Sequence, residues 1–411
     1  MTTVSPFVIV WLLGAAGLGL FWLVRAFAVG VAAGKRETLT SRSACDLPSP
    51  APRVSIIVAA KDEEANIETC VRSLLDQDYP NYEVIAVDDR STDATPRLLR
   101  NLADQADGRF KVVTVAQLRE GWFGKNNAMR EGVTASSGEW LLFTDADCRQ
   151  TSRRTLTVAL ADAIRHEADF LSITPVLETP TVWERILQPV CALVLILWFL
   201  PEKVNDPNRR TAYANGAFML MHRSCYNAIG GHERVRTEVN EDVRMARFAK
   251  RMGLKLRVVE NEDLYRTRMY DTPRAAWNGW SRIFYGCLQT MRRLSISAGQ
   301  LVLVALVPWI CLAVSLILFW NADDAASCSW MLASGAWVLV VIVQQSVMWR
   351  VYRLLRVNPI WSLTYVLGAI ATLAMLLNAM LKTLGASSTT WRSTVYRGDR
   401  LAAELSTDDT D

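Results

Sequence analysis

Acidic side chains cluster directly after three apolar runs of this sequence. The first run ends at Lys61-Asp62-Glu63-Glu64, and two later runs end at Asp88-Asp89 and at Asp145-Ala146-Asp147. A single pair of this kind also fits a helix cap, as Asp93 does. Three clusters at one edge of a sheet, however, repel one another unless a cation or hydrogen-bond donors compensate them. Carboxylate oxygens are hard ligands, so Asp145-x-Asp147 predicts a platform for a divalent cation.

Alternating strands and helices are the elements expected to position these clusters. Short, β-rich apolar runs occupy residues 54–60, 82–87, 110–115, 140–144 and 170–176, with helices expected near 67–75, 93–105, 126–136 and 156–163. The first helix is amphipathic, with apolar residues at i, i+3, i+4, i+7 and i+8 from Ile67. Near-continuous apolar strands separated by helices predict an α/β fold with a mainly parallel sheet covered on both faces. Ligands bind such sheets beyond the carboxyl ends of the strands, where the acidic clusters fall.

The composition adds a membrane part to this architecture. The chain has 411 residues, of which 51% are apolar and 21% charged, and this excludes a disordered chain or a small disulfide-stabilised protein. Four segments without acidic or basic side chains are long enough to cross a bilayer as helices: Pro6–Val24, Gly299–Trp320, Trp330–Trp349 and Ile360–Leu381. The predicted organisation is an N-terminal anchor (1–30), a linker (31–52), a large α/β domain (53–298), three transmembrane helices (299–384) and a tail (385–411).

The charged residues predict how the chain is oriented in the membrane. The 45 basic and 41 acidic residues give a net charge of only +4, but basic residues follow the first span and separate the third from the fourth, at Arg25, Lys35, Arg36, Arg350, Arg353 and Arg356. The loop 321–329 has no basic residue and carries two acids. The positive-inside rule therefore predicts a multi-pass protein of the plasma (inner) membrane with a cytoplasmic catalytic domain. The side of the tail stays open, because its three arginines favour the inside whereas four spans place it outside.

Cysteine and histidine usage gives no sign of a metal–thiolate centre. The eight cysteines form no Cys-x-x-Cys pair, and the chain has only three histidines. This spacing argues against a zinc site or a disulfide framework and fits a reducing compartment. His222 and His232 are interpreted as ordinary polar or core residues.

Six motifs, in this order, resemble those of family 2 glycosyltransferases. They are Val-Ser-Ile-Ile-Val-Ala-Ala-Lys-Asp-Glu-Glu, Val-Asp-Asp-Arg-Ser-Thr-Asp, Gly-Lys-Asn-Asn-Ala, Phe-Thr-Asp-Ala-Asp, Ala-Asn-Gly-Ala-Phe and Val-Asn-Glu-Asp-Val-Arg. The resemblance runs from about Arg53 to Arg293 and implies a GT-A fold (Rossmann-like, mixed and mainly parallel), a nucleotide-diphospho-sugar donor, Mg²⁺ or Mn²⁺, and inversion at the anomeric carbon. One N-terminal span, this domain and three further spans are similar to the membrane branch that glycosylates ceramide, carotenoid or hopanoid-type lipids.

On the donor side, the resemblance assigns a role to each acidic cluster. Glu63 or Glu64, together with Asp88 and Asp89, would hold the ribose and uracil, whose hydroxyl and N3–H groups need acceptors. Lys125 would face the diphosphate. Asp147, with Asp145 nearby, would bind the metal ion across the two phosphates and stabilise the departing nucleoside diphosphate.

On the acceptor side, the resemblance points to two motifs. Asn215-Gly216 is similar to the family's Asn-Gly, where a residue without a side chain leaves room for the sugar. Glu241-Asp242 matches a Glu-Asp pair whose second member is the general base, and inverting transfer needs one base to take the acceptor hydroxyl proton. The alternative is that these two acids occupy a helix first turn, where they complement the helix dipole.

Aromatic and basic side chains further along the chain suit a lipid headgroup boundary. Trp280 and Arg282 are assigned to the acceptor or phosphate side on this basis. Gln289 and Arg292 are placed where processive synthases carry Gln-x-x-Arg-Trp, but the next residue is Arg293. This departure argues against processive chain elongation.

The sequence therefore predicts an inverting, metal-dependent hexosyltransferase that moves one sugar from a nucleotide-diphospho-sugar, expected to be a UDP-sugar, to a lipid hydroxyl at the membrane surface. The short apolar stretch 182–200 predicts an interfacial or re-entrant helix under the active site, with a buried core helix as the alternative. Two other functions remain: a processive polysaccharide synthase of the same fold and a non-catalytic membrane scaffold. Intact Asp145, Asp147 and Asp242 argue against the scaffold. No nucleic-acid partner is expected, and the sugar, the lipid and the oligomeric state stay open.

Overall fold

The chain is divided into two compact units. The computed structural model describes residues 6–106, 108–385, 389–391, 394–397 and 400–401. The membrane unit comprises Met1–Arg36, Thr179–Val194 and Leu288–Thr383. The sheet unit comprises Glu37–Glu178, Leu195–Cys287 and Leu384–Asp411.

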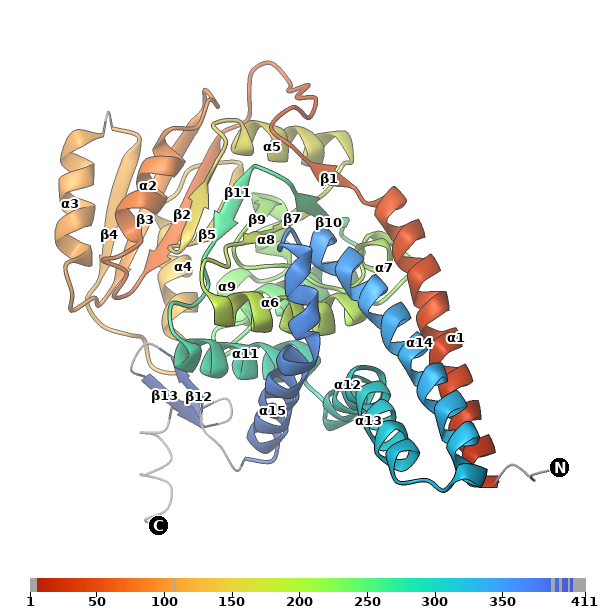
Figure 1. Cartoon of the computed structure of the whole chain (residues 1–411). Helices are drawn as coiled ribbons and strands as arrows, with labels where there is room; N and C mark the ends of the chain where they lie inside the picture. The colour runs from red at the N-terminus through yellow and green to blue at the C-terminus, as the bar shows by residue number, and fades with distance from the viewer. Residues whose placement is uncertain (1–5, 107, 386–388, 392–393, 398–399, 402–411) are drawn as a thin grey trace, which may run out of the picture. The chain divides into compact units, whose positions relative to one another are not determined.

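The sheet unit is built on an eight-stranded sheet with the order β1-β10-β7-β9-β5-β2-β3-β4 (Figure 1). Its strands are β1 (Thr38–Leu39), β2 (Val54–Ala60), β3 (Tyr82–Asp89), β4 (Phe110–Val115), β5 (Trp140–Asp145), β7 (Phe170–Thr174), β9 (Met219–His222) and β10 (Leu256–Asn261). All neighbouring pairs are parallel except those of β9, which is antiparallel to both β5 and β7. The predicted mainly parallel α/β sheet is confirmed. Strands β1, β9 and β10 were not predicted from the sequence, and β9 is the one that makes the sheet mixed.

Helices follow the strands in the predicted alternation. Those of the sheet unit are α2 (Ile67–Leu75), α3 (Thr95–Gln105), α4 (Gly124–Thr134), α5 (Thr155–Arg165), α7 (Pro201–Asn205), α8 (Arg223–Ala228), α9 (Gly231–Arg234), α10 (Glu241–Arg251) and α11 (Pro273–Leu288), the last residue of α11 lying in the membrane unit. A second sheet joins β6 (Cys148–Gln150), β11 (Tyr265–Thr267) and β8 (Val176–Leu177). The backbone of the C-terminal region forms a third, from β12 (Thr389–Trp391), β13 (Thr394–Arg397) and β14 (Arg400–Leu401).

Apolar residues cover both faces of the central strands, which explains why β2 is apolar except at Ser55. Ile56 of β2 and Val84 of β3 belong to the large core that includes residues of α2, α3 and α5. Ile85 and Val87 of β3 pack instead with Ala128 of α4. Successive side chains of a strand point to opposite faces, so β3 contributes to both cores.

The strand register brings the acidic clusters to one edge. Ala60 pairs with Asp88 of β3, and Ala59 pairs with Asp145 of β5. The three central strands therefore end at the same level, and the loops that follow them start side by side. This edge is the carboxyl end of the sheet, where ligands of such folds bind.

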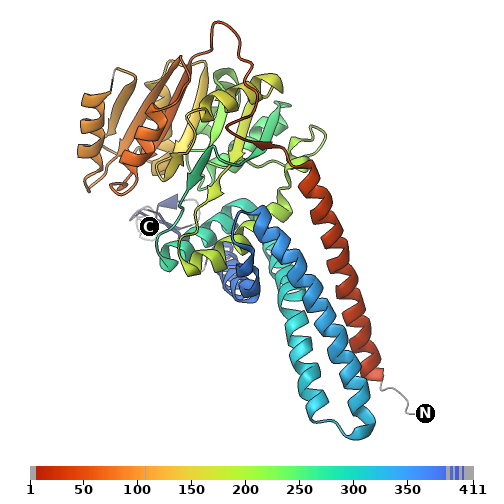
Figure 2. The ribbon, with the colours of Figure 1, turned by 45° about the horizontal axis from the view of Figure 1, so that its top comes forward.

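The membrane unit contains long apolar helices: α1 (Pro6–Lys35), α6 (Val182–Trp198, in this unit up to Val194), α12 (Met291–Leu301), the π-helical segment η1 (Val302–Leu306), α13 (Val307–Trp320), α14 (Asp324–Leu354), the 3₁₀ segment η2 (Pro359–Thr364) and α15 (Tyr365–Thr383). Figures 1 and 2 show α1 and α13 running alongside α14. Five segments of the described residues are long and apolar enough to cross a membrane, and this makes the chain a membrane protein.

Polar side chains inside this unit satisfy backbone groups that the helices leave unpaired. The Gln344 side-chain amide donates to the carbonyl of Val304 (2.7 Å) and lies within hydrogen-bond distance of that of Ala305 (3.3 Å), both in the π-helical segment. The Gln344 oxygen in turn accepts a hydrogen bond from the Trp309 indole (2.8 Å). A polar side chain is stable in an apolar surrounding only with such partners.

The fifth apolar segment contains the helix predicted near 182–200. It covers Val182–Asn205, but Pro189 lies inside α6 and the helix ends at Trp198. Figure 1 shows α6 lying across α15 rather than along it. The two helices approach closely because Gly368 has no side chain, and a Cβ there would lie 2.3 Å from the carbonyl oxygen of Ile186.

The predicted linker 31–52 contains ordered structure. Helix α1 continues to Lys35, and Thr38–Leu39 pairs with β10 as the edge strand of the sheet. Arg257 of β10 holds this segment, because its guanidinium contacts both Glu37 (2.6 Å) and Asp162 (2.7 Å). The sheet therefore begins at Thr38, three residues after the end of α1 and two residues after the boundary between the units at Arg36.

Candidate functional site

Lys125 links two elements that are distant in the sequence. It lies in the first turn of α4, and its Nζ is 2.7 Å from Asp145 Oδ1 at the end of β5 and 2.8 Å from Glu241 Oε1 at the start of α10. Burial alone would lower the pKa of Lys125, but the charges of Asp145 and Glu241 raise it well above its usual value. The lysine is therefore a permanent cation at the centre of the carboxyl edge.

Asp242 lies close to this cation, and two backbone N–H groups hold its carboxylate. Its Oδ2 accepts a hydrogen bond from the backbone N–H of Gly216 (2.8 Å), and its Oδ1 accepts one from Val243 (2.7 Å). Burial, with the charge of Glu241 added, raises the pKa of Asp242 to about 7. A carboxylate with a pKa near the working pH combines a useful ionised fraction with real affinity for a proton.

The backbone at Gly216 passes close to these charges. A Cβ at this position would lie 3.1 Å from Lys125 Nζ and 3.4 Å from Asp242 Oδ2. A side chain here would therefore fill the space beside both groups. This geometry agrees with the idea that Gly216 leaves room for a substrate.

Asp145 and Asp147 form a pair of carboxylates that lacks full compensation. Burial, and then the charge of Asp145, raise the pKa of Asp147 to about 7, although Thr267 donates a hydrogen bond to it. Among the described residues there is no group of three or more His, Cys, Asp and Glu side chains that would hold a metal ion alone. Two carboxylates nevertheless fit Mg²⁺ or Mn²⁺ when substrate phosphates supply the other ligands.

A groove with a volume of about 470 Å³ opens beside Asp147. Its polar lining comes from the loops after β2, β3 and β11: Asp62, Glu63, Glu64, Asn66, Thr92, Asp93, Arg268 and Asp271. Arg268 is the basic residue among these lining residues. The lining of the groove is therefore strongly acidic and includes one guanidinium.

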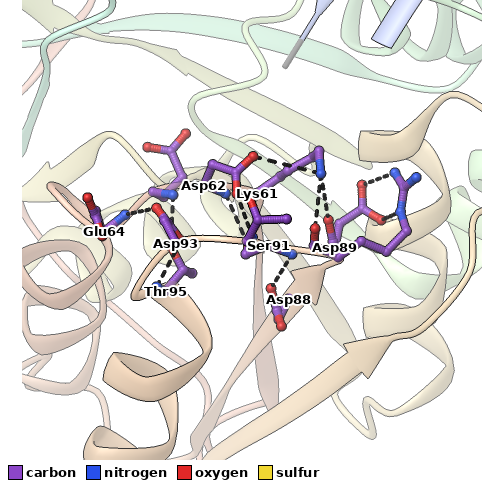
Figure 3. Close-up of polar contacts among 11 residues, drawn as sticks. Lys61, Asp62, Glu64, Asp88, Asp89, Ser91, Asp93 and Thr95 are labelled. Atoms are coloured by element: carbon purple, nitrogen blue, oxygen red, sulfur yellow. Dashed lines mark hydrogen bonds and ion pairs between the residues drawn. The ribbon is translucent and has the colours of Figure 1, made fainter. Parts of the chain in front are cut away.

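The loops after β2 and β3 are locked together (Figure 3). Asp62 Oδ1 accepts a hydrogen bond from the Thr92 backbone N–H (2.8 Å), and the Asp62 N–H donates to Ser91 Oγ (3.1 Å). Asp62 and Arg90 both have positive φ, 52° and 58°. Residues other than glycine adopt this conformation only where surrounding contacts fix it, so the hydrogen bonds account for it.

The two glutamates predicted to bind the donor lie in the same network. Glu64 is held by two hydrogen bonds: its N–H donates to Asp93 Oδ2 (3.0 Å), and its Oε2 accepts one from the Ala94 N–H (2.9 Å). Asp93 also accepts a hydrogen bond from the Thr95 N–H (2.9 Å) at the start of α3. Glu63 accepts one from the Asn66 side chain (3.0 Å). Both glutamates line the groove.

Asp88 and Asp89 are buried at the end of β3 and already have partners. Asp89 accepts two hydrogen bonds from the guanidinium of Arg90 (2.8 and 2.9 Å), and Asp88 Oδ1 accepts one from the Ser91 N–H (3.2 Å). A ligand N–H that bound Asp89 would thus share it with Arg90.

The remaining predicted residues fall in two places. Asn215 lies between Tyr213 and Gly216, and its backbone N–H donates to Ser172 Oγ (2.8 Å). Trp280 is buried on α11 against Phe284, with ring centroids 5.7 Å apart, and Arg282 on the same helix is partly exposed. Two others, Gln289 and Arg292, belong to the membrane unit, at the α11–α12 junction and in the first turn of α12.

Asn126 is a residue of this region to which sequence reasoning assigned no role. Its buried side-chain amide donates to the carbonyls of Val235 (2.7 Å) and Glu238 (2.9 Å). These carbonyls belong to the segment that leads into Glu241 and Asp242. The Gly-Lys-Asn-Asn motif contains Asn126, but a contact between residues so far apart in the chain cannot be read from the motif.

The order and direction of the strands define the fold of the sheet unit, which is the GT-A fold. Residues 55–230 match the family model "Glycosyl transferase family 2". The resemblance predicted from the motifs is therefore confirmed over these residues.

Two curated proteins illustrate the relationship. The chain is 25% identical over 263 residues to 4,4'-diaponeurosporenoate glycosyltransferase from Staphylococcus aureus, covering 62% of this chain and 65% of that protein. It is 40% identical over 109 residues to beta-monoglucosyldiacylglycerol synthase from Nostoc sp., covering 26% of this chain and 23% of that protein. The match thus spans slightly less than two thirds of the first relative.

A solved structure supports the fold. The mannosyltransferase PcManGT from Pyrobaculum calidifontis, in complex with GDP-Man and Mn2+, superposes with a TM-score of 0.51 at 20% identity, covering 92% of this chain and 97% of that one. At this identity the similarity establishes the GT-A architecture and nothing finer.

Proposed function

We propose that this protein is an inverting glycosyltransferase that moves a single sugar from a nucleotide-diphospho-sugar to a lipid hydroxyl at the membrane surface. The observation that carries the proposal is the position of Lys125, whose Nζ contacts both Asp145 and Glu241. This contact joins the elements to which the donor and the base are assigned. Lys125, Glu241 and Asp242 lie beside Gly216, and Asp145 is joined to them through Lys125.

On the donor side, Lys125 and the carboxylate pair would bind the diphosphate. Asp145 and Asp147 would hold Mg²⁺ or Mn²⁺, which when bound neutralises the charge of the departing diphosphate. Lys125 is oriented by Asp145 and Glu241 and would lie against the same phosphates as a point charge. A uridine nucleotide is the proposed donor, with its base and ribose in the groove beside Glu63 and Glu64.

On the acceptor side, Asp242 would act as the general base. The acceptor oxygen forms a bond to the anomeric carbon while the bond from that carbon to the diphosphate breaks. The hydroxyl proton passes to Asp242, and the electron pair leaves with the nucleoside diphosphate. Attack from the face opposite the leaving group inverts the anomeric centre.

The presence of this base favours a hydroxyl acceptor. One relative is named for diaponeurosporenoate, a carboxylate, and another for a diacylglycerol, an alcohol. A carboxylate is ionised at pH 7 and needs no base, whereas a hydroxyl must lose its proton during attack. The raised pKa of Asp242 is useful only in the second reaction.

The apolar helices support a lipid rather than a soluble acceptor. Five segments are long enough to span, and α6 lies across α15 instead of along it. We propose that α6 rests at the membrane interface and that the other four segments span, with the sheet unit in the cytoplasm at the inner membrane, as the basic residues indicate.

Product analysis tests this proposal. Membranes that contain the full chain are incubated with radiolabelled UDP-glucose, UDP-GlcNAc or GDP-mannose and dioleoylglycerol, then extracted with organic solvent. We expect label in one lipid product that carries one sugar, and none with Asp242→Asn. A ladder of additions or a water-soluble polymer would favour a processive synthase, and no incorporation from any donor would contradict the proposal.

A further inference from the structure

Tyr213 lies three residues before Gly216, in the segment that contacts Asp242, and the proposed function assigns it no role. Its ring stacks on Phe199, with centroids 5.2 Å apart and an angle of 24° between the planes. Phe199 is the residue that follows α6. The end of the apolar helix therefore contributes an aromatic support for a tyrosine three residues before Gly216.

The orientation of the neighbouring amide fixes how the Tyr213 hydroxyl is used. Asn215 Oδ1 accepts a hydrogen bond from the Ala217 N–H (3.0 Å), so the other end of this amide is its NH₂ group. That NH₂ group donates to the Tyr213 hydroxyl oxygen (3.3 Å). Tyr213 thus uses its oxygen as an acceptor within the fold.

The hydrogen of the Tyr213 hydroxyl remains available to a ligand. Across the part of the chain that the structure describes, Tyr213 makes the Asn215 and Phe199 contacts and donates to no other group. Burial raises the pKa of Tyr213, and the nearby Cys287 and Asp242 raise it further, so the hydroxyl keeps its proton. The side chain is also partly exposed.

We infer that Tyr213 positions the lipid acceptor by donating a hydrogen bond to an acceptor oxygen next to the reacting hydroxyl, while its ring forms an apolar wall against the lipid. This inference rests on the proposed function and narrows it. The favoured acceptors are lipids with a second oxygen beside the reacting hydroxyl, such as the ester oxygen of a diacylglycerol. A lipid alcohol with one isolated oxygen leaves the Tyr213 hydrogen without a partner.

Two acceptor probes separate this role from a structural one. Dioleoylglycerol has ester oxygens beside its hydroxyl, and oleyl alcohol has the hydroxyl alone. Each is presented in the same phosphatidylcholine vesicles to the full chain with a donor that the wild type uses. We expect Tyr213→Phe, which keeps the ring stacked on Phe199, to lower kcat/KM for dioleoylglycerol about tenfold. Its kcat/KM for oleyl alcohol and its KM for the donor should stay within twofold of the wild type.

A second tyrosine serves as the matched control. The Tyr82 hydroxyl donates to the Leu75 carbonyl (2.7 Å) inside the same unit, so Tyr82→Phe removes a buried hydroxyl in the same way. Tyr82→Phe should leave the ratio of the two acceptor rates unchanged. Tyr213→Ala removes the wall as well and should lower transfer to both acceptors.

The outcomes distinguish this inference from the proposed function. If the wild type glycosylates no lipid at all, neither of the two probes nor any other, with any of the donors, the proposed function fails. If the wild type transfers sugar but Tyr213→Phe keeps the wild-type ratio, or if it raises the KM for the donor instead, the role of Tyr213 is wrong. A wild type that prefers oleyl alcohol to dioleoylglycerol also overturns it.

Discussion

Two regions of the carboxyl edge use acidic residues in opposite ways. In the loops after β2 and β3, carboxylates such as Asp62, Asp89 and Asp93 are matched with nearby donors in the fold. Around Lys125, by contrast, Asp145 and Glu241 share a single lysine as their ion-pair partner. The pKa values of the neighbouring Asp147 and Asp242 are both raised to about 7.

The difference indicates that the loops after β2 and β3 have a fixed structure before a ligand binds, whereas the carboxylates near Lys125 are compensated fully only when a ligand is bound. A carboxylate with all its donors in place is stable before any ligand arrives and fixes the shape of a groove. A carboxylate whose pKa is raised by burial and by a like charge is held ready for a proton or a cation. The following predictions test whether the two regions divide the work in this way.

The largest effect is expected from Asp242. Replacing it with asparagine keeps its size but removes its ability to accept a proton, so kcat should fall by about 10²–10⁴ while the KM for the donor is retained. Steady-state kinetics with the lipid acceptor measures both. Glu238→Gln, whose parent side chain pairs with Arg244 (2.7 Å), is the acid-to-amide control and should behave as wild type. Lost donor binding with unchanged kcat would instead make Asp242 a donor ligand.

A second large effect is expected from Asp147 and from metal removal. Asp147→Asn should lower transfer by about 10²–10³, a loss of the size seen when one transition-state contact to a developing charge is removed. EDTA should abolish the activity of the wild type, and added Mg²⁺ or Mn²⁺ should restore it. Asp76→Asn alters an exposed acid outside the groove, which pairs with Arg153 (3.1 Å), and should have little effect. Full activity in EDTA would remove the metal from the mechanism.

The two regions also differ in how far the sequence could predict them. Strands β2, β3 and β5 were predictable because buried parallel strands are apolar throughout, and the loops that follow such neighbours must meet at one edge. The short strand β9 was missed, since four residues, Met219–His222, carry too little periodic signal. Its insertion between β5 and β7 is what makes the sheet mixed.

Long-range partners were beyond the sequence for a physical reason. The sequence shows that residue 125 is a lysine and therefore a cation. It does not show that Asp145 and Glu241 are its partners, because these contacts depend on how α4 and α10 approach each other in space. The same holds for the contact of Asn126 with the segment before Glu241. By contrast, the Asp89–Arg90 pair joins neighbours in the chain, and the helix cap considered for Asp93 is local.

The pH dependence of the reaction should depend on the region around Lys125 and not on the loops after β2 and β3. Since the pKa of Asp242 is raised to about 7, the base is protonated and inactive below that pH. At saturating donor and Mg²⁺, which keep Asp147 ionised, kcat should fall about tenfold for each pH unit below 7 and level off above it. A profile that stays flat down to pH 5 would mean that Asp242 titrates as an ordinary carboxyl or is not the base.

The smallest effect is expected in the loops after β2 and β3, where each carboxylate is one of several that are hydrogen-bonded and only one is removed. Asp93 accepts hydrogen bonds from the N–H groups of Glu64 and Thr95 (3.0 and 2.9 Å). Asp93→Ala should destabilise these loops by about 1 kcal/mol, as loss of a cap does. This loss corresponds to an increase of about fivefold in the exchange rates of the backbone amides of residues 62–66 and 91–97, measured by hydrogen–deuterium exchange. Asp93→Asn keeps an acceptor oxygen and should lose less.

The pH dependence of this small effect has a definite sign. Burial opposes ionisation of Asp93, but its hydrogen bonds, chiefly those from Thr95, hold its pKa below the ordinary value of 3.8. A depressed pKa in the folded state stabilises the loops above the unfolded value and is lost as the pH falls through the folded one. The exchange difference should therefore be constant from pH 8 to 5 and shrink below 4. Glu68→Ala, which removes an exposed pair with Arg72, should change neither segment. Equal exchange in Asp93→Ala and wild type would show that the loops do not depend on this carboxylate, and the contrast between the two regions would then rest on Asp62 and Asp89 alone.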